Sequence, residues 1–150
     1  PYALQCLQER SGSSVLTDGL DLYGKGYSDC VLAARTPLLE EKPEAVKAVI
    51  KAMMTAQLMT EQDTLSTLEE TVGKYYKTSL ESLKLAQSSQ PVMIDQRNNT
   101  KFFYDRSVSM QKMGYVKNTL PSKAVNWTLL EEVIAENADL YGKLELKTAA

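Results

Sequence analysis

The feature that most constrains this chain is a helical spacing of apolar residues that begins at Pro43. From there, apolar side chains recur three and four residues apart, among them Val46, Ile50 and Met53. This period places them on one face of an α-helix and puts Lys47 on a face that we expect to lie in water. Because such a helix must bury its apolar face, the spacing predicts that it packs against other parts of the chain.

Similar patterns predict a mainly helical chain, with about five or six helices in total. One helix is expected to start at Asp63. Capping residues mark other expected helix starts, at residues 98–100 and at either Asn126 or Thr128. Gly114 is expected to end a helix. With a short helical turn at 36–41, the expected helices cover residues 1–10, 43–58, 63–76, 80–88, 101–113 and 128–140.

Two short apolar runs, at residues 15–17 and 30–34, predict β-strands. The second run contains no polar side chain, which suits a strand that is covered on both faces, as in an α/β sheet. Residues 92–94 are expected to form either a brief strand or an extended crossing. The predicted fold class is therefore α/β, mainly helical, with a few short strands.

Composition limits the function classes that this chain can serve. Its 150 residues suit one domain, and 17 basic against 19 acidic residues give a net charge of −2, so nucleic acid is not an expected partner. The absence of histidine removes Ser-His and Cys-His pairs and imidazole metal sites. We expect no catalysis, no cofactor and no metal ion. Acidic pairs such as Glu40-Glu41 are expected to lie on solvated helix faces rather than to act as general acids or bases. The alternative is an enzyme in which a Glu or Tyr side chain acts as the general acid or base.

The two cysteines, Cys6 and Cys30, are too few and too far apart in the sequence for a zinc site or a disulfide framework. We expect two ordinary buried thiols, with a bridge between them as the alternative. No apolar stretch is long enough to span a membrane, because charged residues interrupt even the stretch 46–59.

The best candidate for a ligand-facing position is the triplet Tyr27, Ser28 and Asp29. It brings hydroxyl and carboxylate groups to the start of the apolar run 30–34. The preceding glycines, Gly24 and Gly26, resemble a phosphate-binding loop only superficially, since the Lys-Ser/Thr ending and a following helix are missing. The alternative for the triplet is a polar loop between strands.

Five segments, read in order, resemble the second half of the nitrate/sulfonate/taurine-type substrate-binding proteins of ABC transporters. This family also includes pyrimidine-precursor binders. Asn126 stands where the family commonly has an Asp, and the likeness covers nearly the whole chain. The segments are Pro-Tyr-Ala at 1–3, Val-Leu-Thr-Asp-Gly at 15–19, the run 27–35, the run 38–52, and Asn-Trp-Thr-Leu-Leu-Glu-Glu at 126–132.

The resemblance implies part of a two-lobed receptor with a periplasmic-binding-protein type II fold. Such a receptor closes on a small anionic or heterocyclic solute and presents it to ABC permease subunits. It implies an extracytoplasmic location, with membrane contact only through the permease or a lipid anchor. At matching positions it implies that Tyr2, Tyr27, Ser28 and Asp29 line the solute pocket.

The resemblance also divides the chain into parts of one fragment. Residues 1–29 correspond to the end of the second lobe, 30–35 to a crossing strand, and 36–141 to a helical part that returns to the first lobe. We expect the first lobe before Pro1, a frayed tail at 142–150, and self-association through apolar faces that lack the first lobe. The alternative function is a helical protein–protein interaction module.

Overall fold

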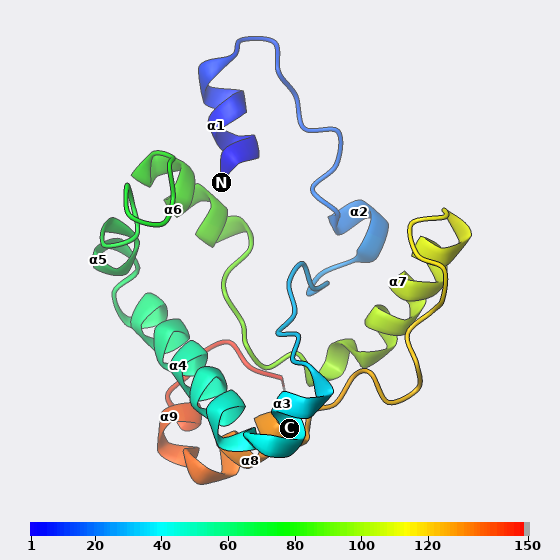
Figure 1. Ribbon diagram of the computed structural model, residues 1–150. Helices are drawn as coiled ribbons and strands as arrows, with labels where there is room; N and C mark the ends of the chain where they lie inside the picture. The colour runs from blue at the N-terminus through cyan, green and yellow to red at the C-terminus, as the bar shows by residue number, and fades with distance from the viewer. Residues whose placement is uncertain (149–150) are drawn as a thin grey trace.

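The structure, a computed structural model, describes residues 1–148 and forms a chain of helices joined by loops (Figure 1). This confirms the expectation of a mainly helical protein. Within the described residues there are nine α-helices and one short 3₁₀ helix. They are α1 Tyr2–Glu9, α2 Leu20–Tyr23, α3 Thr36–Glu41, α4 Pro43–Gln62, α5 Thr64–Glu69, α6 Leu80–Ser89, η1 Arg97–Asn99, α7 Thr100–Lys112, α8 Thr128–Glu136 and α9 Ala138–Gly142.

Local sequence signals account for several of the helix ends. Pro43 occupies the first turn of α4, where its missing N–H costs no hydrogen bond. The side chains of Asp63 and Ser79 cap α5 and α6 by accepting hydrogen bonds from backbone N–H groups three residues later. Gly114 follows α7 with a φ of 80°, a left-handed conformation that glycine adopts without steric cost.

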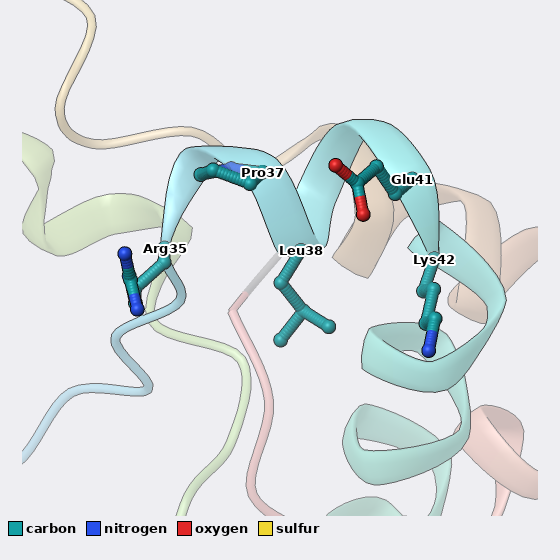
Figure 2. A pocket seen from close by; sticks show the side chains of 5 residues that line it. All are labelled: Arg35, Pro37, Leu38, Glu41 and Lys42. Carbon is teal, nitrogen blue, oxygen red and sulfur yellow. The ribbon is translucent and has the colours of Figure 1, made fainter.

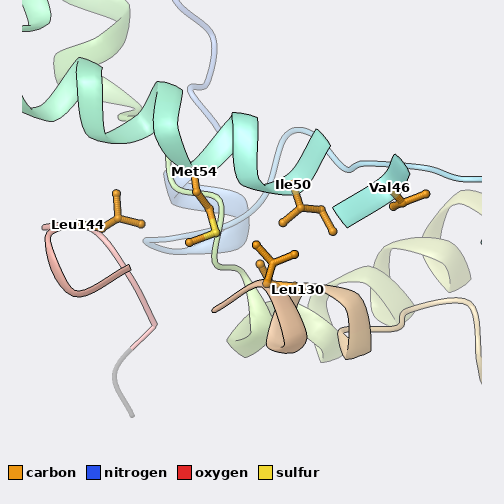
Figure 3. Close-up of a cluster of buried hydrophobic side chains, with 6 residues drawn as sticks. Val46, Ile50, Met54, Leu130 and Leu144 are labelled. Carbon is orange, nitrogen blue, oxygen red and sulfur yellow. The ribbon is translucent and has the colours of Figure 1, made fainter. Parts of the chain in front are cut away.

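The core forms where α4 meets the C-terminal helices. Val46, Ile50 and Met54 lie on one face of α4 and pack against Leu130 and Val133 of α8, as Figure 3 shows for most of this cluster. Leu144, beyond α9, is also part of the cluster. The 20-residue helix α4 therefore buries the apolar face that its spacing predicts, although Met54 takes the central place rather than Met53.

Lys47 is buried, so the prediction that it lies in water is wrong. Its ammonium group lies 3.5 Å from a carboxylate oxygen of Glu44 and 3.4 Å from one of Glu132, and it also donates a hydrogen bond to Glu136. That hydrogen bond raises the pKa of Lys47 above its usual range. The lysine is tolerated beside the core because α8 supplies two carboxylates that the spacing on α4 alone does not reveal.

The strands predicted at 15–17 and 30–34 are not formed, and the α/β part of the predicted fold class is not borne out. Within residues 1–148, the only β pairing is an isolated bridge between Val72 and Tyr76. Residues 30–34 and residues 92–94 are neither helix nor strand. A strand forms only when its backbone groups pair with a neighbour, and the described part of the chain offers none.

Residues 143–148 contact other parts of the described chain, and the expected fraying of 142–150 stays a prediction. Leu144 is buried, and the backbone oxygen of Leu146 accepts a hydrogen bond from Gln57 at 2.7 Å. Thr148 donates a hydrogen bond to the backbone oxygen of Asp95 at 3.0 Å. These contacts hold 143–148 against α4 and the segment before η1, while residues 149–150 lie outside the described part.

Both cysteines are exposed and free, so neither the expected buried thiols nor the alternative bridge is found. Cys6 lies on α1, and Cys30 lies in the unpaired segment after α2. Within residues 1–148, no helix combines the length and apolar character that crossing a membrane requires.

The helices are distributed over an open arrangement rather than one continuous bundle (Figure 1). α1 packs on α6, α5 connects α6 to α4, and α4 in turn contacts α3, α8 and α9. α7 projects on the other side of the molecule, beyond η1. The main core of residues 1–148 therefore lies at one end, around α4 and α8.

We predict that Met54→Ala destabilises the protein, because Met54 is only 1% exposed and its removal leaves a cavity between α4 and α8. The expected loss in the free energy of unfolding is about 2–5 kcal/mol, measured by urea denaturation. Met59→Ala is the matched control on the same helix. Met59 is 49% exposed, so its replacement should change the free energy by no more than about 0.5 kcal/mol. Equal effects of the two substitutions would contradict the described core.

Candidate functional site

Tyr27 is the best anchored of the predicted pocket residues. Its hydroxyl donates a hydrogen bond to the backbone oxygen of Asp18 and accepts one from Gln90 Nε2 at 2.6 Å. Its ring also covers Gly19, where a Cβ would lie 2.5 Å from the Tyr27 hydroxyl oxygen. Burial, reinforced by Asp29, raises the pKa of this hydroxyl.

Tyr27 belongs to an aromatic cluster that joins the α2 region to α7. The ring centroids of Tyr23 and Tyr27 lie 5.5 Å apart, and Phe102 lies 5.8 Å from Tyr23 and 6.3 Å from Tyr27. The cluster continues through Phe103 to Trp127, with centroid separations of 5.9 Å and 6.3 Å. Tilted and edge-on contacts at these distances stabilise the docking of an otherwise loosely held segment.

Polar and cationic groups surround this cluster. The guanidinium carbon of Arg106 lies 4.4 Å from the centroid of the Tyr23 ring. Asn99 Nδ2 donates a hydrogen bond to the backbone oxygen of Gly26 at 2.8 Å. Trp127 Nε1 donates one to Thr100 Oγ1 at 2.7 Å. Both donors are engaged within the chain and Arg106 lies over the Tyr23 ring, so these contacts hold the α2 region against α7.

The other two members of the predicted triplet lie at the edge of this cluster. Ser28 Oγ donates a hydrogen bond to the backbone oxygen of Cys30 at 3.0 Å. The carboxylate of Asp29 is exposed and forms no hydrogen bond or ion pair with any residue of the described part. Asp29 is therefore available to a ligand, whereas Ser28 is engaged with its own loop.

Tyr2 is not brought to the triplet. It lies on α1, which packs on α6, and its hydroxyl accepts a hydrogen bond from the backbone N–H of Lys77 at 3.4 Å. No hydrogen bond within residues 1–148 joins Tyr2 to Tyr27, Ser28 or Asp29. The resemblance groups these four residues in one pocket, and the structure brings together only the three that are adjacent in sequence.

A hollow of about 250 Å³ lies next to the segment 30–34, at its junction with α3 (Figure 2). Arg35 and Lys42 supply two basic side chains and Glu41 one acidic side chain, while Pro37 and Leu38 form the apolar part. No group of three or more His, Cys, Asp or Glu side chains in the described part is arranged to hold a metal ion.

A buried amide holds the tail and the segment before η1 against α4. Gln57 is fully buried, and its Nε2 donates hydrogen bonds to Leu146 O at 2.7 Å and to Glu61 Oε1 at 2.8 Å. Its Oε1 accepts a hydrogen bond from the backbone N–H of Ile94 at 2.8 Å. Glu61 in turn accepts from the backbone N–H groups of Glu145 and Leu146. Burial alone would raise the pKa of Glu61, but these hydrogen bonds outweigh burial and lower it.

Asp95 is the centre of a second buried polar group. Arg97 donates to both of its carboxylate oxygens at 2.9 Å, and the Tyr141 hydroxyl donates to Oδ2 at 2.5 Å. Burial alone would raise the pKa of Asp95, but the bonds from Arg97 and Tyr141 outweigh burial and lower it to about 2. This group ties η1 to α9 and has a structural role.

The sequence singles out the triplet but not the contacts that position it, nor the hydrogen-bond partners of Gln57 and Asp95. Gln57 lies on the helical stripe of α4, so its burial could be anticipated there. The spacing of Asp95 and Arg97 indicates a local pair, but nothing in the sequence brings Tyr141, 44 positions after Arg97, to the same carboxylate.

We predict that Asp95→Asn removes a pH-dependent part of the stability. Because folding lowers the pKa of Asp95 to about 2, its ionised form stabilises the protein above pH 4, and this stabilisation is lost as the pH falls toward 2. The expected contribution is about 2 kcal/mol. Urea denaturation at several pH values should give a flatter profile for Asp95→Asn between pH 4 and 2.

The matched control is Asp139→Asn, at an exposed carboxylate that takes part in no ion pair of the described part. Its profile should keep the slope of the unmodified protein. A profile for Asp95→Asn that is as steep as that of the unmodified protein would contradict the role assigned to this carboxylate.

Comparison with family models, with curated proteins and with solved structures finds no match to this chain. The resemblance to ABC-transporter receptors therefore stays a prediction made from sequence segments.

Proposed function

We propose that this chain is part of a solute-binding component of an ABC importer of the nitrate/sulfonate/taurine type. In this role it closes together with another lobe on a small anionic or heterocyclic solute and delivers it to permease subunits outside the cytoplasm. The proposed fold of the chain is part of a periplasmic-binding-protein type II receptor. In this receptor, residues 30–35 cross between the two lobes, and residues 36–141 form the helical part that returns to the first lobe.

The proposal rests on the exposed apolar side chains and the unpaired backbone of residues 30–34. The segment is wholly apolar, yet Val31 is 66% and Leu32 is 48% exposed. No backbone hydrogen bond joins residues 31–34 to any other part of the described chain. Apolar side chains with unpaired backbone groups are typical of a strand that lacks its sheet, and a second lobe would supply that sheet.

The position of the candidate site supports the same role. Tyr27, Ser28 and Asp29 immediately precede this segment, so a lobe that paired with residues 30–34 would lie against them. Polar groups beside a crossing segment between lobes meet the requirement of a cleft that closes on its ligand. The available carboxylate of Asp29 favours solutes that carry an amine or a ring N–H, such as taurine or a pyrimidine.

A helical interaction module is the second candidate function, and the region after α7 favours it. Met113 is 57% exposed and Tyr115 is 75% exposed, and both follow the projecting end of this helix. Exposed Met and Tyr side chains are enriched at protein interfaces. Co-purification of a protein partner that is lost in Tyr115→Ala, together with no response to small solutes, would favour this function over the receptor.

We predict that a solute of this class stabilises the complete gene product in a thermal-shift assay with nitrate, sulfonates, taurine and pyrimidines. A ligand that binds only the native state adds about 2.7 kcal/mol to apparent stability at 100 times its Kd. Asp29→Asn should reduce the shift for amine-bearing or N–H-bearing solutes, because it removes the acceptor charge. It should not reduce the shift for nitrate, which has no hydrogen to donate.

Asp139→Asn, at an exposed carboxylate on α9, is the control and should leave every shift unchanged. If no solute of these classes raises the melting temperature, the receptor function is wrong. If a solute raises it equally in both variants, the solute site does not include Asp29.

A further inference from the structure

Helix α7 and the loop that follows it form a projecting hairpin, called here the arm, which comprises residues 100–124 (Figure 1). The backbone N–H of Leu120 donates a hydrogen bond to Ser107 Oγ at 3.2 Å, and Gln111 Nε2 donates one to the backbone oxygen of Lys117 at 3.0 Å. These bonds hold the returning loop against the helix. The chain reverses at residues 110–117, called here the tip, which lie at the free end of the arm.

The tip presents apolar side chains to solvent. Every residue from 110 to 124 is exposed. Tyr115 is 75% and Met113 is 57% exposed, and Met110 and Val116 are exposed beside them. Four large apolar side chains among eight consecutive residues form an exposed patch, and such patches mark interaction sites.

The charge of the arm is opposite to that of the rest of the chain. No acidic residue lies between positions 105 and 131, whereas this stretch contains four basic residues. The other 125 residues contain 13 basic and 19 acidic residues. Lys112, Lys117 and Lys123 form no ion pair within residues 1–148. An anionic surface therefore attracts the arm while it repels the rest of the molecule, which directs the tip toward that surface.

The chemistry and shape of the tip favour a lipid surface over a protein surface. A lysine places its apolar stem along hydrocarbon while its ammonium group reaches a phosphate, and tyrosine is enriched where hydrocarbon meets water. A projecting tip buries little area against a protein unless that protein offers a matching recess. A bilayer interface adapts to the shape of the tip and supplies both an apolar phase and negative charge.

We propose that the tip docks this protein on the surface of a bilayer that contains anionic phospholipid. Met113, Tyr115 and Val116 enter the interface, and Lys112 and Lys117 contact phosphate groups. This goes beyond the proposed function, which uses no residue of the tip. It adds a membrane contact by the chain itself to those through a permease or a lipid anchor that the resemblance implies.

Co-sedimentation of the 150-residue chain with vesicles tests the attraction. Vesicles of equal parts phosphatidylglycerol and phosphatidylcholine should bind the protein at about 50 mM salt, and binding should weaken as salt is added. Phosphatidylcholine alone should bind at least about tenfold more weakly. Each of Lys112→Gln and Lys117→Gln should weaken binding about fivefold, and the two together about 25-fold.

The matched control is the double variant Lys51→Gln with Lys84→Gln. It removes the same charge from exposed positions on α4 and α6, where neither lysine forms an ion pair within residues 1–148. Its binding should stay within about twofold of the unmodified protein. Circular dichroism of each variant shows whether the helices remain, so that loss of binding is not confused with loss of folding.

Fluorescence quenching tests whether the tip enters the interface. Tyr115→Trp places an indole at the tip, and brominated lipid in the phosphatidylglycerol vesicles should quench it. The unmodified protein is the control, because its only tryptophan, Trp127, lies beyond the arm and packs against Phe103. Tyr115→Ser should weaken vesicle binding about tenfold, because it removes an apolar ring from the contact.

Several results would overturn the proposal. They are no binding to phosphatidylglycerol vesicles at low salt, equal binding to phosphatidylcholine alone, equal losses in the tip and control double variants, and no extra quenching in Tyr115→Trp. A protein partner that is lost in Tyr115→Ala, together with no vesicle binding, would assign the tip to the interaction module instead. Failure of every solute in the thermal-shift assay would reject the receptor function and leave vesicle binding unaffected.

Discussion

Burial of one face of α4 is the interaction on which the rest of the described structure depends. Met54 and its neighbours exclude water between α4 and α8, and apolar burial of this kind is the main favourable contribution to folding. The same face contains Gln57, whose amide is buried and fully hydrogen bonded. Because an unpaired buried amide is costly, those hydrogen bonds also fix where the tail and the segment before η1 must lie.

The distribution of order along the chain follows from this one core. Around α4, α8 and the tail, apolar packing and buried polar groups act together, and Lys47 and Asp95 are each held by several partners. Between α1 and α3, the chain is held mainly by the aromatic cluster. The candidate site lies in this second region, where Tyr27 is anchored and Asp29 is free. Ligand-binding segments are commonly drawn from such weakly constrained parts.

Residues 1–148 form no sheet because residues 30–34 have no strand to pair with, and not because their strand propensity is poor. Residues 30–34 have the composition of a covered strand, but strand hydrogen bonds need a second strand, and none is offered by the described residues. The proposed function arises from this unpaired segment. A second lobe would complete it in a solute receptor.

The sequence by itself determined the helices with strong apolar spacing and clear caps, such as α4 after Pro43, α6 after Ser79 and α7 before Gly114, because these signals are local. It also singled out Tyr27, Ser28 and Asp29 as neighbours. Only the tertiary structure decided that Lys47 and Asp95 are buried, that residues 143–148 dock, and that Tyr2 lies apart from the triplet. Each of these depends on groups distant in sequence, whose approach no local pattern encodes.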